Sequence, residues 1–229
     1  MKLAARRRRI KLPGAGAVSA VIALPQRFRP GRTPAVLLAH GAGAGMSSPF
    51  VSFVHAELAR AGYVAVKFNF PYTEARRRTP DPRPVLERCH RAVLDAVAAD
   101  RALLPPWIAI GGKSLGGRIA SYLGAAGAPV RGLFFLGYPL HPAGKPDVLR
   151  VDHLPAVAVP MLFIQGTRDA LCEFDRLRPV LGRLPRAALH VVEGGDHSFR
   201  LPRREGKPEE AVWSEVVGAV VRWLPGLGG

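Results

Sequence analysis

The chain has little of what a disulfide scaffold or a metal centre needs. It contains only two cysteines, Cys89 and Cys172, which lie far apart and fit neither a Cys-x-x-Cys pair nor the spacing of zinc ligands. The histidines are also scattered without metal-ligand spacing. We therefore expect no bound metal, and we interpret both cysteines as reduced, structural thiols, which favours a cytoplasmic location.

Long hydrophobic runs are absent as well. Although 48% of the 229 residues are hydrophobic, no apolar stretch reaches the roughly 20 residues that a membrane-spanning helix needs. A chain of this length and composition can bury one well-packed core. We expect a soluble protein with no membrane contact, folded as a single domain over residues 1–229.

The N-terminal segment has some features of a targeting signal. Arg6 to Arg9 form a basic run, and the residues from Gly14 to Leu24 are largely apolar. Against a signal peptide, the apolar part is short, no small-x-small cleavage site follows, and residues 18–25 have the pattern of a strand. We expect residues 1–15 to be a basic segment, a candidate for flexibility, that precedes the first strand.

Acidic residues are scarce relative to basic ones. There are 17 against 33, which leaves a formal net charge of +16 at pH 7. The basic residues are spread along the chain, without interleaved aromatic residues or a recognition module, and only six are lysine. We expect non-specific, salt-sensitive attraction to polyanions and no specific recognition of nucleic acid.

Apolar runs that alternate with helical patterns fill most of the chain. From residue 35 onward the runs are nearly continuous, as in a parallel sheet that is covered on both faces. The predicted strands are 17–24, 35–40, 64–70, 107–112, 131–138, 161–165 and 188–192, and the predicted helices are 49–61, 84–101, 115–126, 175–184 and 209–224. This pattern predicts an α/β fold with a doubly wound, mostly parallel sheet.

The strongest local signal is a Gly-x-Ser-x-Gly motif that joins a strand to a helix. The apolar strand from Trp107 continues into Gly112-Lys113-Ser114-Leu115-Gly116, and a helical pattern follows. Such a turn holds the serine in a strained conformation with its hydroxyl exposed, and glycines are needed on both sides because side chains would collide there. Ser114 is the first candidate nucleophile.

An acid and a histidine follow further along the chain. Asp169 comes just after the apolar strand 161–165, and His197 comes just after the strand 188–192. Serine, then aspartate, then histidine, each just past a strand, is the order of α/β-hydrolase triads and differs from the chymotrypsin and subtilisin orders. The neighbouring Asp196 is interpreted as a turn residue.

Upstream, the strand 35–40 enters the loop His40-Gly41-Ala42. In this interpretation a backbone N–H of the loop stabilises an oxyanion and His40 positions the loop. In the alternative, purely structural interpretation, Ser114 is a helix cap, Asp169 is part of a turn at a strand end and His197 is a surface-loop residue. Three such coincidences in the right order are hard to obtain by chance.

Two nucleotide-binding interpretations of the same glycines do not fit. A P-loop needs a glycine five positions before Gly112, where Trp107 stands inside the strand. The run 41–46 resembles a dinucleotide fingerprint, but Met46 stands where the third glycine belongs, and no acid ends the next strand. We therefore expect no cofactor.

Several longer segments match a known family in order. They are LAHGAGAGMSSPF (38–50), KFNFPYTEARRRTPDPRP (67–84), GGKSLGGRIAS (111–121), GYPLHPAGKP (137–146), QGTRDALC (165–172) and EGGDHSF (193–199). With them the chain resembles the dienelactone-hydrolase-like α/β hydrolases, and within these the small group related to the hydrolase-like subunit of an animal histone-acetyltransferase (NSL) complex. The resemblance implies an α/β-hydrolase fold and the triad Ser114, Asp169 and His197.

These residues have defined expected roles. Ser114 attacks a carbonyl carbon, His197 takes its proton, and Asp169 orients the imidazole. The backbone N–H groups of Ala42 and Leu115 hold the oxyanion.

Two irregular loops, 71–84 and 138–160, are expected to wall the pocket at the strand ends. Within them Tyr72, Tyr138 and His141 are candidates for substrate contact, although packing is the commoner role of such residues. Lys113 is expected to be paired or solvated. The second loop has only about twenty residues, so no large lid domain is expected.

Two classes of function remain open from the sequence. One is a serine hydrolase that cleaves a small carboxylic ester or thioester through an acyl-enzyme intermediate. The other is a hydrolase-like interaction scaffold whose basic surface binds a protein or a polyanion, because the animal relative is discussed mainly as a complex subunit. Fluorophosphonate labelling of Ser114 separates the two classes.

Overall fold

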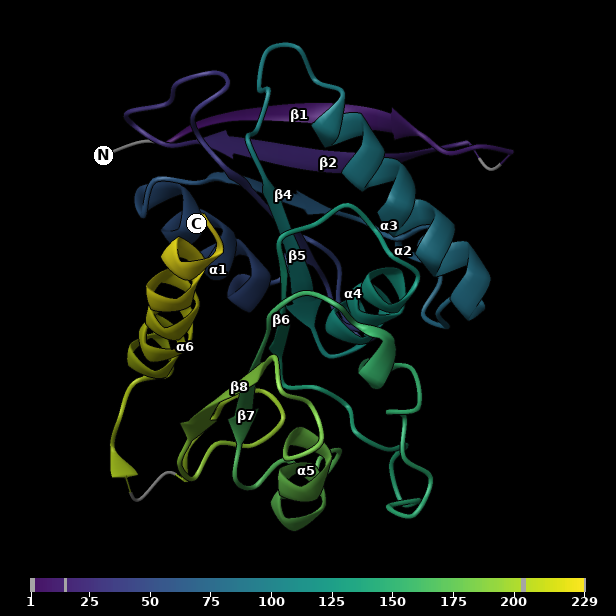
Figure 1. Cartoon of the computed structure of the whole chain (residues 1–229), viewed down its shortest axis with the longest axis vertical. Helices are drawn as coiled ribbons and strands as arrows, with labels where there is room; N and C mark the ends of the chain where they lie inside the picture. The colour runs from purple at the N-terminus through teal and green to yellow at the C-terminus, as the bar shows by residue number, and fades with distance from the viewer. Residues whose placement is uncertain (1–2, 15, 203–204, 229) are drawn as a thin grey trace.

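The computed structural model describes residues 3–14, 16–202 and 205–228. An eight-stranded sheet with the strand order β1-β2-β4-β3-β5-β6-β7-β8 forms its centre (Figure 1). The strands are β1 (Ala4–Lys11), β2 (Ala17–Leu24), β3 (Ala35–Ala39), β4 (Val64–Phe68), β5 (Ile108–Lys113), β6 (Gly132–Leu136), β7 (Met161–Gly166) and β8 (Ala187–Val192). β2 pairs antiparallel with both β1 and β4, and all pairings from β4 to β8 are parallel. The predicted doubly wound, mostly parallel sheet is confirmed.

Helices cover both faces of the sheet. They are α1 (Pro49–Arg60), α2 (Pro71–Glu74), α3 (Arg83–Ala98), α4 (Leu115–Ala125), α5 (Phe174–Leu181) and α6 (Glu209–Trp223). α1 and α6 lie together over one face, and α3, α4 and α5 lie over the other (Figure 1). Within β3, Leu37 packs in one hydrophobic core and Val36 and Leu38 in the opposite one. Burial on both faces explains why the strands are continuous apolar runs.

The predicted elements from residue 17 onward agree with the structure to within three residues at each end. The short helix α2 lies in the predicted loop 71–84, and a 3₁₀ turn at Leu154–Ala156 lies in the loop 138–160. No large lid is inserted between β6 and β7. Among the described residues, no helix is both long and apolar enough to cross a membrane.

The N-terminal segment departs from the prediction. Residues 4–11 of the basic segment 1–15 form the edge strand β1, which pairs antiparallel with β2 along its whole length. Residues 1, 2 and 15 lie outside the described residues. β1 buries only Ile10, and two of its arginines form ion pairs, Arg8 with Asp100 and Arg9 with Glu74. Because the strand is held by pairing with β2 and not by an apolar face, its sequence shows no alternating pattern.

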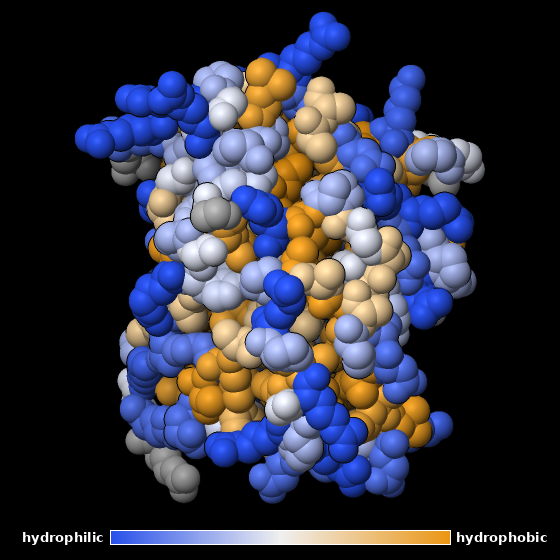
Figure 2. Space-filling view, viewed as in Figure 1, coloured by the Kyte–Doolittle hydropathy of each residue, from blue (hydrophilic) through white to orange (hydrophobic). Residues whose placement is uncertain are grey.

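The charged surface is dispersed, as the sequence indicates. Figure 2 shows hydrophilic side chains spread over one face of the molecule and projecting at the end where β1 lies. They are interrupted by apolar side chains and do not merge into a continuous stripe.

Candidate active site

Ser114 stands between β5 and α4 in a strained conformation. Its φ is 50° and its ψ is −114°, a region that residues with a side chain rarely adopt. The turn needs glycine on both sides. A Cβ on Gly112 would lie 2.3 Å from the carbonyl oxygen of Ala39, and one on Gly116 would lie 2.5 Å from the same atom. This close passage beside β3 turns the serine hydroxyl outward at the end of the sheet.

The structure brings Ser114, His197 and Asp169 together from three strand ends. Nε2 of His197 lies 2.8 Å from Oγ of Ser114, and Nδ1 lies 2.7 Å from Oδ2 of Asp169. The carboxylate only accepts hydrogen bonds, so Nδ1 carries the proton and Nε2 accepts from the serine hydroxyl. The imidazole is therefore in the tautomer of a general base toward Ser114.

The Asp169 carboxylate is fully buried and held by three donors. Besides Nδ1 of His197, the amide of Gln165 donates to Oδ2 at 2.6 Å, and the Leu171 N–H donates to Oδ1 at 2.8 Å. The competing acid Asp196 instead accepts the backbone N–H groups of Ser198 and Arg200, both at 2.8 Å. Asp196 is thus a turn residue, as its position beside His197 indicated.

His40 and Tyr72 hydrogen-bond to backbone oxygens of the loop after β3. Nδ1 of His40 donates to the Gly41 oxygen at 2.8 Å, and its Nε2 accepts the Phe70 N–H at 3.1 Å. Burial lowers the pKa of His40, so the ring stays neutral and serves both bonds. The Tyr72 hydroxyl lies 3.2 Å from the Gly41 oxygen and 3.1 Å from the Ala42 oxygen. These contacts hold the carbonyl groups of Gly41 and Ala42 in place.

Two pockets meet at Ser114. The larger, of about 600 Å³, extends between the loop after β3, the start of α1 and the His197 loop, and Lys113, Phe50 and Trp213 line it. The smaller, of about 280 Å³, contains both expected oxyanion donors, Ala42 and Leu115. The site can therefore hold one part of a substrate on each side of the serine.

Both predicted loops wall the smaller pocket. Pro80, Asp81 and Arg83 come from the first loop and the start of α3, and Pro139 and Arg150 come from the second.

The smaller pocket is basic. Among the described residues, Arg118 and Arg150 have no carboxylate partner, and the buried Nε of Arg118 has no hydrogen-bond partner. Burial and the neighbouring Arg118 lower the pKa of Arg150. The pocket's acid, Asp81, is paired with Arg77 at 2.5 Å.

Substrate contact by Tyr138 and His141 is not what the structure indicates. Tyr138 is completely buried and donates its hydroxyl to the Arg150 oxygen at 2.8 Å, while its N–H donates to Gln165. His141 is 2% exposed and bonds the Pro142 oxygen. Neither lines the two pockets at Ser114, and nor does Tyr72, which lies behind the oxyanion loop. Tyr138 and His141 are buried beside the site, and Tyr72 lines a separate pocket together with Ala42.

Sequence reasoning did not assign roles to two residues that adjoin the triad. Gln165 supports Asp169, and its signal is a single amide inside an otherwise apolar strand. Lys113 was expected to be paired or solvated, but its Nζ is buried and has no hydrogen-bond partner among the described residues.

The cysteines lie outside the site. Burial raises the pKa of the Cys89 thiol to about 12 and also raises that of Cys172, so neither is a thiolate at neutral pH. The described residues include no cluster of three or more His, Cys, Asp or Glu side chains suited to a metal ion.

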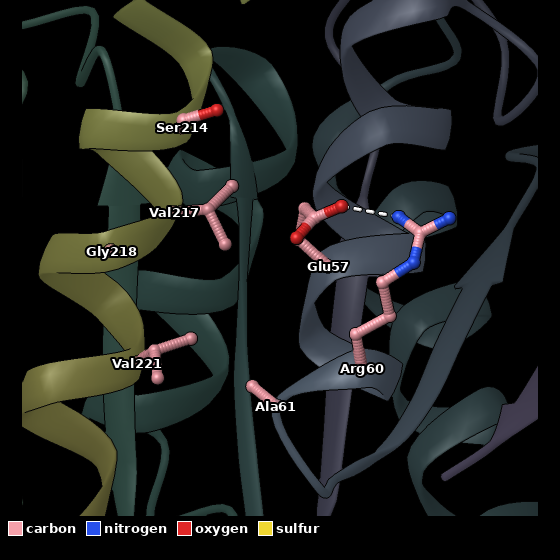
Figure 3. A pocket seen from close by; sticks show the side chains of 7 residues that line it. All are labelled: Glu57, Arg60, Ala61, Ser214, Val217, Gly218 and Val221. Atoms are coloured by element: carbon pink, nitrogen blue, oxygen red, sulfur yellow. Dashed lines mark hydrogen bonds and ion pairs between the residues drawn. The ribbon is translucent and has the colours of Figure 1, made fainter. Parts of the chain in front are cut away.

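A separate pocket of about 330 Å³ lies between α1 and α6, and none of Ser114, Asp169 and His197 lines it (Figure 3). Glu57 and Arg60 are paired with each other, the Ser214 hydroxyl donates to the Glu210 oxygen, and Val217 and Val221 of α6 line the side opposite α1.

A family model described as an alpha/beta hydrolase domain matches residues 32–225. The chain belongs to this α/β-hydrolase family. The match covers every element from β3 through α6, and so includes the whole candidate site.

Solved α/β hydrolases share the fold over nearly the whole chain. A dienelactone hydrolase of Anabaena variabilis aligns with a TM-score of 0.76 at 19% identity over 97% of each chain. A serine hydrolase homologue of Coxiella burnetii gives 0.74 at 20% identity, covering 96% of this chain and 97% of that one. A lidless α/β serine hydrolase of Xanthomonas campestris gives 0.72 at 21%, covering 97% and 96%. At these identities the likeness establishes the fold; the narrower relation to the histone-acetyltransferase subunit stays a prediction.

Proposed function

We propose that this α/β hydrolase is a serine hydrolase that cleaves a small carboxylic ester or thioester through an acyl-enzyme intermediate. The observation that carries the proposal is the unbroken chain of hydrogen bonds from the Ser114 hydroxyl through His197 to the buried Asp169. A strained serine at a strand end, an imidazole hydrogen-bonded to it and a buried carboxylate together form the machinery of nucleophilic acyl transfer.

In the first half-reaction Oγ of Ser114 forms a bond to the carbonyl carbon while Nε2 of His197 takes its proton. The negative charge of Asp169 stabilises the imidazolium that results. When the bond to the leaving group breaks, His197 gives the proton to the departing alcohol or thiol. An acyl group then remains on Ser114.

In the second half-reaction water takes the place of the leaving group. His197 accepts a proton from the water as its oxygen attacks the acyl carbon, and it returns that proton to Oγ as the acid departs. In both steps the carbonyl oxygen becomes negatively charged. We assign the N–H groups of Ala42 and Leu115 to that oxygen; such a donor contributes about 3 kcal/mol in studied hydrolases.

Labelling by a fluorophosphonate tests the nucleophile. We expect wild type and Ser198→Ala to be labelled and Ser114→Ala to remain unlabelled, since Ser198 lines the same pocket but has no contact with the imidazole in the hydrogen-bond network described above. On an ester and thioester panel, kcat/KM of Ser114→Ala and His197→Ala should fall by at least about 10³. Activity within tenfold of wild type in either variant would exclude this triad.

A second candidate function, an interaction scaffold, is favoured by β1 alone. Arg6 and Arg7 are exposed on the edge strand and have no carboxylate partner among the described residues. Their charge would attract a polyanion through release of counter-ions. A mobility-shift titration of Ser114→Ala with unrelated DNA duplexes tests this function: sequence discrimination that persists at high salt would support the scaffold, and weak binding lost on adding salt would not.

A further inference from the structure

Lys113 carries a buried charge that the proposed chemistry does not yet use. It ends β5 and directly precedes Ser114, and its stem lines the larger pocket. Its Nζ has no exposed surface and no hydrogen-bond partner among the described residues. A buried ammonium is costly unless opposite charge lies near it. Opposite charges near Nζ must therefore offset the cost of burying the Lys113 ammonium.

The ammonium and the triad carboxylate border the same small space above Gly137. A Cβ placed on this glycine would lie 3.0 Å from Nζ of Lys113, 3.3 Å from the His197 oxygen and 3.6 Å from Oδ2 of Asp169. Gly137 has a φ of 68°, which also disfavours a side chain. The turn after β6 thus leaves no side chain between the lysine and the hydrogen-bonded edge of Asp169.

Charged groups and one aromatic ring from the neighbouring loops surround the Lys113 ammonium. The loop after β7 supplies Asp169, and the loop after β8 supplies Asp196, His197 and the ring of Phe199, whose centroid lies 5.6 Å from Nζ. The turn after β3 contributes only backbone and Gly41 beside the lysine stem.

Across the larger pocket, Glu209 of α6 is paired with Arg200 at 2.9 Å. Burial lowers the pKa of Lys113 to about 8, and attraction to the carboxylates of Asp169 and Asp196 opposes that shift. The opposite charge of the two carboxylates thus favours the ammonium form.

We propose that Lys113 is a positioning residue of the triad: its buried ammonium offsets the carboxylates of Asp169 and Asp196 and keeps the His197 imidazole neutral, the form that accepts the proton of Ser114. The inference rests on the proposed hydrolase function. Asp169 is hydrogen-bonded to the imidazole, and Asp196 directly precedes His197 in the chain. Negative charge near an imidazole favours the imidazolium, which cannot act as a base. A buried cation that is attracted to the same carboxylates reduces this preference.

The charge balance has a measurable consequence. A unit charge several ångströms away in a protein shifts a pKa by on the order of one unit. Lys113→Met removes the charge and keeps the length of the side chain. In this variant the acid limb of the pH profile of kcat/KM should move to higher pH by about one unit. Asp196→Asn should move it downward, and the double variant should return close to wild type. Lys145→Met, at an exposed lysine, should leave the limb in place.

The experiment measures kcat/KM on a short nitrophenyl ester from pH 5 to 9 and, in parallel, the NMR titration of the His197 imidazole. Circular dichroism checks the fold of each variant; if the methionine variant does not fold, Lys113→Gln takes its place. A Lys113 variant whose acid limb and imidazole titration both coincide with wild type would overturn the inference and leave the proposed hydrolase intact.

The NMR titration of His197 tests the role of Lys113 independently of the proposed hydrolase activity. If wild type shows no Ser114-dependent hydrolysis, the proposed function fails, and the His197 titration still reports on the charge balance. An upward shift in Lys113→Met then supports the electrostatic role of the lysine, and an unchanged titration excludes it.

Discussion

Replacing Asp169 by asparagine tests the site most sharply, because the structure leaves no acceptable orientation for an amide. Oδ2 accepts hydrogen bonds from His197 and Gln165, and Oδ1 accepts the Leu171 N–H. If the amide nitrogen takes the place of Oδ2, it faces two donors. If it takes the place of Oδ1, it faces the Leu171 N–H. Either orientation sets a donor against a donor.

The simplest relief is a change of tautomer. If Nδ1 of His197 becomes an acceptor for the new amide, Nε2 carries the proton and can no longer accept from Ser114. Gln165 cannot adapt easily, since its other end accepts the Tyr138 N–H at 2.9 Å. In a serine protease the same substitution lowers kcat by about 10⁴, or about 5.5 kcal/mol of barrier, for this reason. We expect a loss of that order here.

The assay compares kcat/KM of Asp169→Asn and Asp196→Asn on one short ester, each at its own pH optimum. Asp196→Asn should stay within a few-fold of wild type, because that carboxylate accepts turn N–H groups and does not touch the imidazole. The folded Asp169→Asn protein should also lose about 1–3 kcal/mol of stability from an unsatisfied buried donor. A nearly normal Asp169→Asn together with an impaired Asp196→Asn would show that the acid of the triad is Asp196.

Four further predictions follow from other parts of the molecule. Gly116→Ala should lower the free energy of unfolding by about 1–3 kcal/mol in urea titrations, because its Cβ would lie 2.5 Å from the Ala39 oxygen; Gly226→Ala, with nothing within 4 Å, is the control. Burial lowers the pKa of His90 to about 3, so the neutral ring stabilises the fold above its unfolded pKa of about 6.5, and this stability is lost as pH falls toward 3. The slope of unfolding free energy against pH between 6 and 4 should therefore shrink by about 1.4 kcal/mol per unit in His90→Leu, and an unchanged slope would contradict the burial argument. On nitrophenyl esters kcat/KM should peak within the first few acyl carbons, because the pockets are open clefts without a large lid, and a steady rise with chain length would refute this. Arg118→Gln should raise KM about tenfold for the monoester of a dicarboxylic acid and little for a neutral ester of equal length, since Arg118 has no carboxylate partner in the smaller pocket; equal changes for both esters would count against an anion-binding role.

Much of the fold can be predicted from local pattern. Strands β3 to β7 are buried on both faces, so they appear in the sequence as apolar runs between amphipathic helices, and that pattern alone predicts a parallel sheet. The edge strand β1 could not be predicted in this way. All of its residues except Ile10 are exposed, and pairing with β2 along its whole length makes it a strand.

The candidate site also contains residues that the sequence predicts and residues that it does not. Ser114, Asp169 and His197 could be named from the sequence because each comes within a short loop after a strand, and parallel strands bring their carboxyl ends to one edge of the sheet. The bulky loop residues could not be placed, because whether Tyr138 faces a pocket or the core depends on packing between β5, β6 and β7. The local order of residues therefore determined the fold class and the candidate reacting groups. Only the tertiary structure decided that Tyr138 is buried, that Lys113 lies beside Asp169, and that two unlike pockets meet at Ser114, because each depends on distances between segments far apart in the chain.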